Sequence, residues 1–263
     1  LSFDPLFRVR DHLKWWPWVG SEFARTTVKT MILGESVYRW SKGEAFDKRY
    51  ALTSALRETH SNHALDFDRN SRYVRNIERA IFQRRNPSDT QKQTLWSSVA
   101  YHNLVLDAMQ TVKHRPSQDQ YQKGWDAALD LFDVLGVEQC LVFGVESISS
   151  LRLASSAREL HCLIRRHPAK VGRFRPSSGT VRSKSGRQVS LLFVRHPSSF
   201  FSWRNWAPVV QEGMQWKLVE PLPLPEPDEQ LANEPQGSAL GHCNPAATNG
   251  CLPNPSSLDG RSG

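Results

Sequence analysis

The chain has few cysteines, few methionines and no long apolar segment. Its 263 residues include three methionines and four cysteines, which are Cys140, Cys162, Cys243 and Cys251. None of the cysteines forms a C-x-x-C pair, and their spacing fits neither a zinc site nor an iron–sulfur site. No apolar run approaches the roughly 20 residues that cross a bilayer. These absences exclude an integral membrane protein and a small disulfide scaffold.

Several motifs of common enzyme classes are also missing. The sequence contains no G-x-G-x-x-G, P-loop or G-x-S-x-G motif, which argues against the dinucleotide, nucleotide and hydrolase sites that these motifs build. We expect no secretory signal, because Asp4, Arg8, Arg10 and Asp11 interrupt the N-terminal segment. Without a signal, the cysteines are expected to be free thiols in a reducing cytosol.

Charge is distributed unevenly along the chain. The formal net charge is +8, from 34 Lys and Arg against 26 Asp and Glu. Residues 219–263 hold six acidic residues against Arg261 and eight of the 16 prolines, a net charge of −5 that leaves +13 for residues 1–218. We predict a folded domain over 1–218 and a disordered, acidic, Pro-rich tail over 219–263. A body of +13 favours a polyanionic partner.

Apolar runs alternate with helical patterns in the body. Strands are predicted at 28–33, 99–106, 139–143 and 189–194, and helices at 51–59, 72–84, 117–135, 148–166 and 203–215. Ser117 and Gln120 have the spacing of a capping box. The alternation predicts a three-layer α/β/α domain with a mainly parallel, four-stranded sheet. Ligands of such sheets bind beyond the carboxyl ends of the strands.

Three segments at the predicted strand ends carry a family resemblance. GESVY (34–38), LWSSVAYHNLVL (95–106) and HPSSF (196–200) occur in this order. Together they resemble the uracil-DNA glycosylase superfamily over about residues 15–210. The segment WPWVG…KTMILGESVY also resembles uncharacterised prokaryotic proteins with a Gly-Glu-Ser-His-Tyr signature. The resemblance implies a uracil-DNA glycosylase-like fold and a DNA partner, with no cofactor and no metal.

The resemblance assigns roles to the second and third segments. Asn103 would read the base, because its amide offers both a donor and an acceptor to a uracil edge. His196 would donate to the uracil O2 as negative charge develops there. Ser198 and Ser199 would bind a DNA phosphate, and Phe200 would fill the gap that the flipped base leaves. The alternatives are that Asn103 caps a loop and that His196 is a structural histidine.

The first segment departs from the best-known branch of the family. Ser36 stands where that branch has an Asp that orients water, whereas Glu35 looks like the iron–sulfur-containing branch, whose cysteine spacing is absent here. Glu35 would position water or stabilise the sugar cation; alternatively, it hydrogen-bonds backbone N–H groups. Tyr38 resembles the Tyr that excludes the thymine methyl group. Phe46, with Tyr50 as second choice, would stack on the base, unless both belong to the core.

Two other clusters invite weaker interpretations. HSNHALDFD, with His60, His63, Asp66 and Asp68, has metal-like composition, but we favour a solvated loop between helices. The basic stretch 170–187 is predicted to be a loop or hairpin that either follows a DNA backbone or is simply solvated.

The predicted function is that of a uracil-DNA glycosylase-like enzyme, a cytoplasmic monomer of the bacterial cytosol or nucleoid. It would flip a deaminated base out of DNA and hydrolyse its N-glycosidic bond. Catalysis would use Glu35 and His196, and substrate binding would use Ser36, Tyr38, Phe46 and Asn103. The alternatives are a catalytically silent nucleic-acid or nucleotide-binding protein on the same fold, favoured by Ser36, and an unrelated α/β domain.

Overall fold

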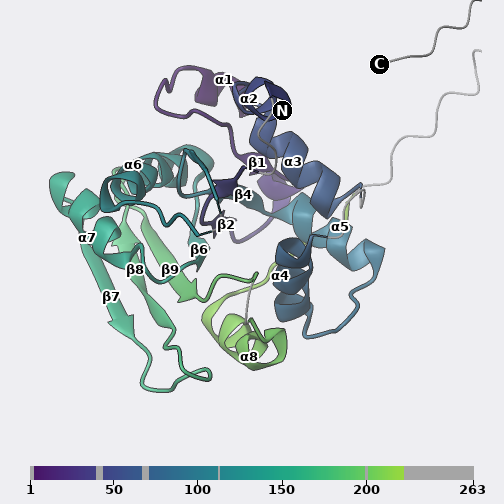
Figure 1. Ribbon diagram of the computed structural model, residues 1–263. Coiled ribbons are helices and arrows are strands. Elements are labelled where there is room, and N and C mark those ends of the chain that lie inside the picture. The colour runs from purple at the N-terminus through teal and green to yellow at the C-terminus, as the bar shows by residue number, and fades with distance from the viewer. Residues whose placement is uncertain (1–2, 40–43, 67–70, 112, 199–200, 222–263) are drawn as a thin grey trace, which may run out of the picture. The chain divides into compact units, whose positions relative to one another are not determined.

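The computed structural model describes residues 3–39, 44–66, 71–111, 113–198 and 201–221 (Figure 1). Val219, the first residue assigned to the tail, exchanges hydrogen bonds with the Ser98 hydroxyl through its backbone N and O, at 2.8 and 3.0 Å. The chain around Val219 is therefore attached to the folded part. The predicted disorder of the remaining tail falls on residues 222–263, which lie outside the described residues.

A seven-stranded mixed sheet forms the centre, in the order β1-β4-β2-β6-β9-β8-β7. Its four middle strands β4 (Ala100–Asn103), β2 (Thr30–Gly34), β6 (Gln139–Phe143) and β9 (Gln188–Val194) are parallel. The edge strands β1 (Trp18–Val19), β8 (Ser177–Arg182) and β7 (Cys162–Arg166) pair antiparallel to their neighbours. A separate parallel pair joins β3 (Val37–Tyr38) to β5 (Ala108–Met109).

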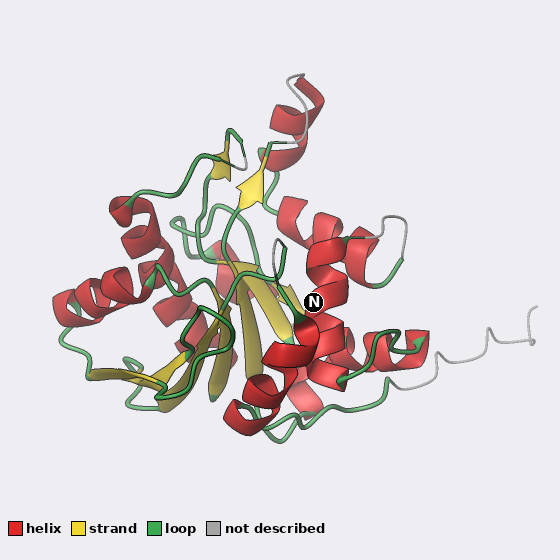
Figure 2. Cartoon of the chain, turned by 60° about the horizontal axis from the view of Figure 1, so that its bottom comes forward, coloured by secondary structure: helices red, strands yellow, loops and turns green. Residues whose placement is uncertain are grey.

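Helices cover both faces of the sheet (Figure 2). The described helices are α1 (Asp4–Arg8), α2 (Glu44–Tyr50), α3 (Ala55–Ala64), α4 (Arg72–Phe82), α5 (Asp89–Ser98), α6 (Gln118–Leu135), α7 (Ile148–Ala157), α8 (Trp203–Gly213) and the 3₁₀ turn Phe23–Arg25. One face packs on α6 and α7 through Met31 and Leu33. The other packs on α3, α4, α5 and α8 through Ile32. This alternation follows from the two-residue period of a strand buried on both faces.

The fold class is confirmed, but the predicted number of strands is wrong. The four predicted strands are the four parallel ones, whereas β1, β7 and β8 were missed. β7 falls in the segment 148–166, which was predicted as a single helix; α7 instead ends at Ala157, and Glu159 adopts the left-handed φ of 56°. The sequences of β7 and β8 (CLIRR and SSGTVR) lack an apolar run, so pairing with each other and with β9 defines them.

Helix α6 illustrates a segment whose local signals suffice. Ser117 and Gln120 form the predicted capping box, and Gly136 ends the helix with a left-handed φ of 64°. Ser88 and Gln91 form an equivalent box at the start of α5, a helix that the sequence reading missed. None of the described helices is long and apolar enough to cross a membrane.

Candidate functional site

The carboxyl ends of the four parallel strands meet at one edge of the sheet. Gly34 at the end of β2 pairs with Asn103 at the end of β4. Gly144 and His196 follow β6 and β9. A Cβ atom placed on Gly144 would lie 3.5 Å from Oε1 of Glu35, so the β6 end reaches the residue that follows β2. We refer to this edge as the carboxyl edge; Glu35, Asn103 and His196, one from each motif, stand at or just after the strand ends that form it.

Glu35 is a buried carboxylate held by three side chains. It is 2% exposed. Its Oε1 accepts hydrogen bonds from the Tyr121 hydroxyl at 2.7 Å and from Nη2 of Arg115 at 2.8 Å. Its Oε2 accepts one from the Tyr38 hydroxyl at 3.2 Å. All three donors are side chains, so these bonds do not match the alternative in which backbone N–H groups bind this carboxylate.

Arg115 connects the buried carboxylate to the surface. Its side chain is 51% exposed, and Nη2 also pairs with Oε2 of Glu146. Burial alone would lower the pKa of the Arg115 guanidinium, but the charges of Glu35 and Glu146 raise it instead. Burial and the hydrogen bond to Glu35 likewise raise the pKa of Tyr121. The guanidinium therefore stays charged within reach of solvent, beside the motif GESVY.

Asn103 packs against the backbone of Gly34. A Cβ atom on Gly34 would lie 2.3 Å from Oδ1 of Asn103, and 2.6 and 2.7 Å from the hydroxyl oxygens of Tyr73 and Tyr101. A side chain at position 34 would therefore force these three polar groups to move. The Tyr101 hydroxyl donates to Oδ1 of Asn103 at 2.9 Å. Tyr101 thus already orients the side-chain amide of Asn103, the predicted base-reading residue.

His196 lies next to the same tyrosine cluster. Its ring centroid is 5.1 Å from that of Tyr73, and its Nδ1 is 2.9 Å from the Ser198 hydroxyl oxygen. Burial, with the nearby positive charges of Arg115 and Arg195, lowers the pKa of His196 to about 4. The imidazole is therefore neutral at pH 7. When the Ser198 hydroxyl donates to Nδ1, the single ring hydrogen is on Nε2 and is available as a donor.

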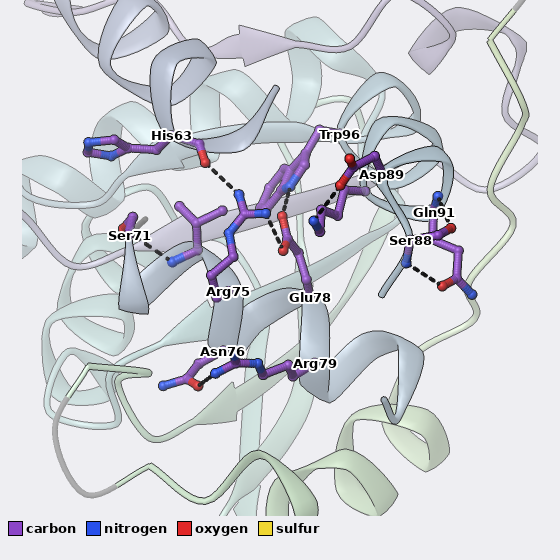
Figure 3. Close-up of polar contacts among 12 residues, drawn as sticks. His63, Ser71, Arg75, Asn76, Glu78, Arg79, Ser88, Asp89, Gln91 and Trp96 are labelled. Carbon is purple, nitrogen blue, oxygen red and sulfur yellow. Dashed lines mark hydrogen bonds and ion pairs between the residues drawn. The ribbon is translucent and has the colours of Figure 1, made fainter. Parts of the chain in front are cut away.

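Helix α4 supports the loop that carries His196. Tyr73 contributes its ring, and Nδ2 of Asn76 donates to the Pro197 carbonyl at 2.7 Å. Figure 3 shows how α4 is fixed to α5: Nη1 of Arg75 lies 2.9 Å from Oε2 of Glu78, whose Oε1 accepts from the Trp96 indole at 2.8 Å. Glu78 is fully buried, and burial raises its pKa to about 7.

Phe46 and Tyr50 pack together beside a cavity. Phe46 is 1% exposed, and its ring stacks on Tyr50 with a centroid distance of 4.4 Å. Both line a cavity of about 340 Å³ together with Lys14, Trp15, Arg39, Asp47, Ala51, Asp107, Ala108 and Gln110. Glu35, Asn103 and His196 are not among its lining residues. The structure therefore does not place the predicted stacking aromatics in one cavity with these three residues.

The remaining predicted residues lie in varied surroundings. Tyr38 is on β3, and half-buried Ser36 lies beside its hydroxyl. Ser198 contacts His196, whereas Ser199 and Phe200 lie outside the described residues. The segment HSNHALDFD (60–68) was expected to be a loop, but its first five residues, up to Ala64, belong to α3. Asp68 lies outside the described residues. Within the described ranges, no three potential ligands gather around a metal position.

His60 of that segment is a core residue. It is buried, and its ring stacks on Tyr101 at 4.2 Å. Burial lowers the pKa of His60 to about 3, so it stays neutral. Tyr101, on which the His60 ring stacks, also donates to Asn103. His60 therefore supports the residue that orients Asn103.

Sequence reasoning missed five contributors to the carboxyl edge, namely Tyr73, Tyr101, Arg115, Tyr121 and Glu146. Tyr101 could have been predicted, because it lies two residues before Asn103 on the same strand, and residues two apart on a strand share a face. Arg115 and Glu146 are in connecting segments, where no periodicity marks them. No protein-family model matches the chain, and no curated protein matches it. The functional assignment is therefore argued from geometry and chemistry.

Proposed function

We propose that the chain is a DNA N-glycosylase that binds an extruded, deaminated pyrimidine at the carboxyl edge and hydrolyses its N-glycosidic bond. The proposal is carried by one observation: Asn103 and His196, remote in sequence, flank the same residue, Tyr73. An amide and a neutral imidazole on either side of one tyrosine suit a uracil edge. Asn103 pairs with O4 and N3–H, and His196 donates from Nε2 to O2 as that oxygen gains negative charge.

Glu35 supplies the negative charge that this reaction needs near the sugar. The transition state of glycosidic cleavage is cationic at the sugar, so a buried carboxylate stabilises it even when its oxygens accept hydrogen bonds. Tyr38 and Tyr121 orient the carboxylate, and neither carries a positive charge. Arg115 offsets part of the charge, which implies slow turnover as long as it pairs with Glu35.

A second function is favoured by the saturation of Glu35. Three side-chain donors already hold this carboxylate, and Ser36 offers no other carboxylate for orienting water. A catalytically silent protein that binds nucleic acid or nucleotides at the same edge would need Asn103 and His196 but not Glu35. The two functions differ in whether product forms.

An excision assay separates the two functions. Single- and double-stranded oligonucleotides containing uracil are incubated with the full chain, and abasic sites are detected by alkaline cleavage. We expect Asn103→Ala and His196→Ala each to abolish product while circular dichroism stays unchanged. His161→Ala and Asn205→Ala, at exposed positions, are matched controls and should keep wild-type rates. Unchanged turnover in both site variants would reject the site; binding without product would support the silent function.

The pH profile tests the role given to His196. Because the pKa of His196 is lowered to about 4, the imidazole keeps one protonation state across neutrality, and kcat/KM should be flat there, with no step at about 6.5 that depends on His196. The assay is limited to pH values at which circular dichroism shows a folded chain. A rate that instead declines as pH rises through about 6.5, the ordinary pKa of histidine, would mean that the charged imidazole acts, contrary to the proposal.

A further inference from the structure

The C-terminal third of the folded region contains a long segment without acidic residues. Between Glu159 and Glu212 the sequence has no Asp or Glu but ten Lys and Arg. This segment includes β7, β8, β9 and the start of α8. Such a one-signed segment repels itself and attracts polyanions. The fold decides whether its cations act together.

The hairpin divides these cations between the two edges of the sheet. Arg166, Ser177 and Phe193 lie in one row across β7, β8 and β9, so the loop 167–176 lies at the carboxyl edge. Figure 1 shows the arrows of β7 and β9 pointing the same way. Arg182 pairs with Gln188 at the other end of β8, about 17 Å away at the rise of an antiparallel strand. Lys184 and Arg187 lie with it, in the turn between β8 and β9.

The loop 167–176 is anchored against the residue that precedes His196. The Arg195 guanidinium lies 3.7 Å from the ring centroid of Phe174, and that of Arg173 lies 5.2 Å from it. Val171 and Phe174 form a bridge and pack on the core. Burial and the charge of Arg173 lower the pKa of Arg195, so two cations stand close together beside His196. The loop therefore presents positive charge from an ordered backbone.

Lys170 and Arg173 are exposed. Among the ion pairs found in the described residues, none involves either side chain. By contrast, Arg158, which follows α7, pairs with Asp126 and Asp130, as is usual for a surface cation. Concentrating cations on one loop costs folding energy, which the charge of Glu146 near Arg195 offsets only in part, and a bound polyanion recovers it.

We propose that Lys170, Arg173 and Arg195 form a phosphate-binding surface that holds the backbone of a nucleic acid strand beside His196. The inference rests on the proposed function, because that function names DNA as the substrate. The strand's phosphates contact the loop 167–176, while the extruded nucleotide enters the carboxyl edge. Arg182, Lys184 and Arg187 take no part, since they lie at the opposite edge.

The division of the hairpin provides a matched pair of variants. Lys170→Ala/Arg173→Ala and Arg182→Ala/Lys184→Ala each remove two exposed charges from the same hairpin, but at opposite edges. Binding of the full chain to a fluorescein-labelled, uracil-free single strand is followed by anisotropy across a salt series. We expect the first variant to bind roughly tenfold more weakly and to reduce the slope of log K against log salt by about 1.4. The second should behave like the wild type.

Three outcomes would overturn the inference: equal weakening by both variants, no weakening by either, or absence of binding by the wild type. Equal weakening would mean that net charge alone attracts the strand. The uracil-free probe keeps this test independent of catalysis. If the wild type excises no uracil but only the carboxyl-edge variant loses affinity, the proposed enzymatic function fails and the phosphate surface stands. If excision occurs and both variants bind alike, the reverse holds.

Discussion

The two edges of the parallel sheet use buried polar side chains differently. At the amino edge, Gln139 donates to the Thr30 hydroxyl and to the Gln215 carbonyl, both at 2.7 Å, and accepts from the Gln215 N–H at 2.9 Å. At the carboxyl edge, the Glu35 carboxylate accepts from three side chains among the described residues, one of which, Arg115, is half exposed. Burial is similar at the two edges, whereas the bonding partners differ.

This difference separates structural polar groups from candidate functional ones. Backbone partners hold Gln139 between two segments, and its hydrogen-bonding groups are used up. Side-chain partners at the carboxyl edge can rotate away when a ligand supplies equivalent groups. Changes at the carboxyl edge are therefore expected to affect function, and changes at the amino edge only stability.

The largest effect is expected from Glu35→Ala. The substitution leaves the Tyr121 and Tyr38 hydroxyls without their acceptor, while half-exposed Arg115 keeps its pairing with Glu146, and we expect the free energy of unfolding to fall by about 3–4 kcal/mol, at about 1–3 kcal/mol for each hydroxyl. Urea denaturation followed by fluorescence measures it. Tyr121→Phe, which removes one donor, should cost about 1 kcal/mol. A fully stable Glu35→Ala protein would show that the carboxylate is not structurally engaged.

Glu78→Gln tests the buried carboxylate behind the site. Because burial raises the pKa of Glu78 from 4.5 to about 7, the folded chain holds this proton more tightly than the unfolded chain. This contribution to stability is complete below pH 4.5 and is lost as pH rises toward and through 7, by up to about 3 kcal/mol at about 1.4 kcal/mol per pKa unit. Thermal unfolding between pH 5 and 8 should show this decline for the wild type and a flatter curve for Glu78→Gln. Parallel curves would refute the assignment.

Gln139→Leu is the amino-edge counterpart of the Glu35 variant. The Thr30 hydroxyl and the backbone groups of Gln215 lose their partners, so the free energy of unfolding should fall by about 2 kcal/mol. Oligonucleotide affinity and excision per folded molecule should stay at wild-type values. A loss of affinity without unfolding would end the distinction between the two edges.

The smallest effect is expected from Gly136→Ala, also on the amino side. Gly136 ends α6 with a φ of 64°, where a Cβ atom costs about 1 kcal/mol. Thermal unfolding should register this loss, and the pH dependence of unfolding should stay unchanged. An unaltered melting temperature would mean that the turn relaxes.

Local patterns predicted much of the fold and part of the site. Strands β2, β6 and β9 each contain a short apolar run, and α6 has a capping box and a terminal glycine, so residues close in sequence are enough to predict them. The positions of Glu35, Asn103 and His196 after strand ends follow from the same runs. β7 and β8 lack such runs, and α5 was overlooked despite its capping box.

The sequence by itself determined the alternation of helices with buried strands, the excess of positive charge in the body and the presence of three polar segments beyond strand ends. These features depend on residues a few positions apart. Only the tertiary structure decided that Tyr121 and Arg115 hold Glu35, that Phe46 faces another cavity and that the basic hairpin is split between two edges. Each of these depends on strand pairing and helix packing between distant residues, which no local pattern encodes.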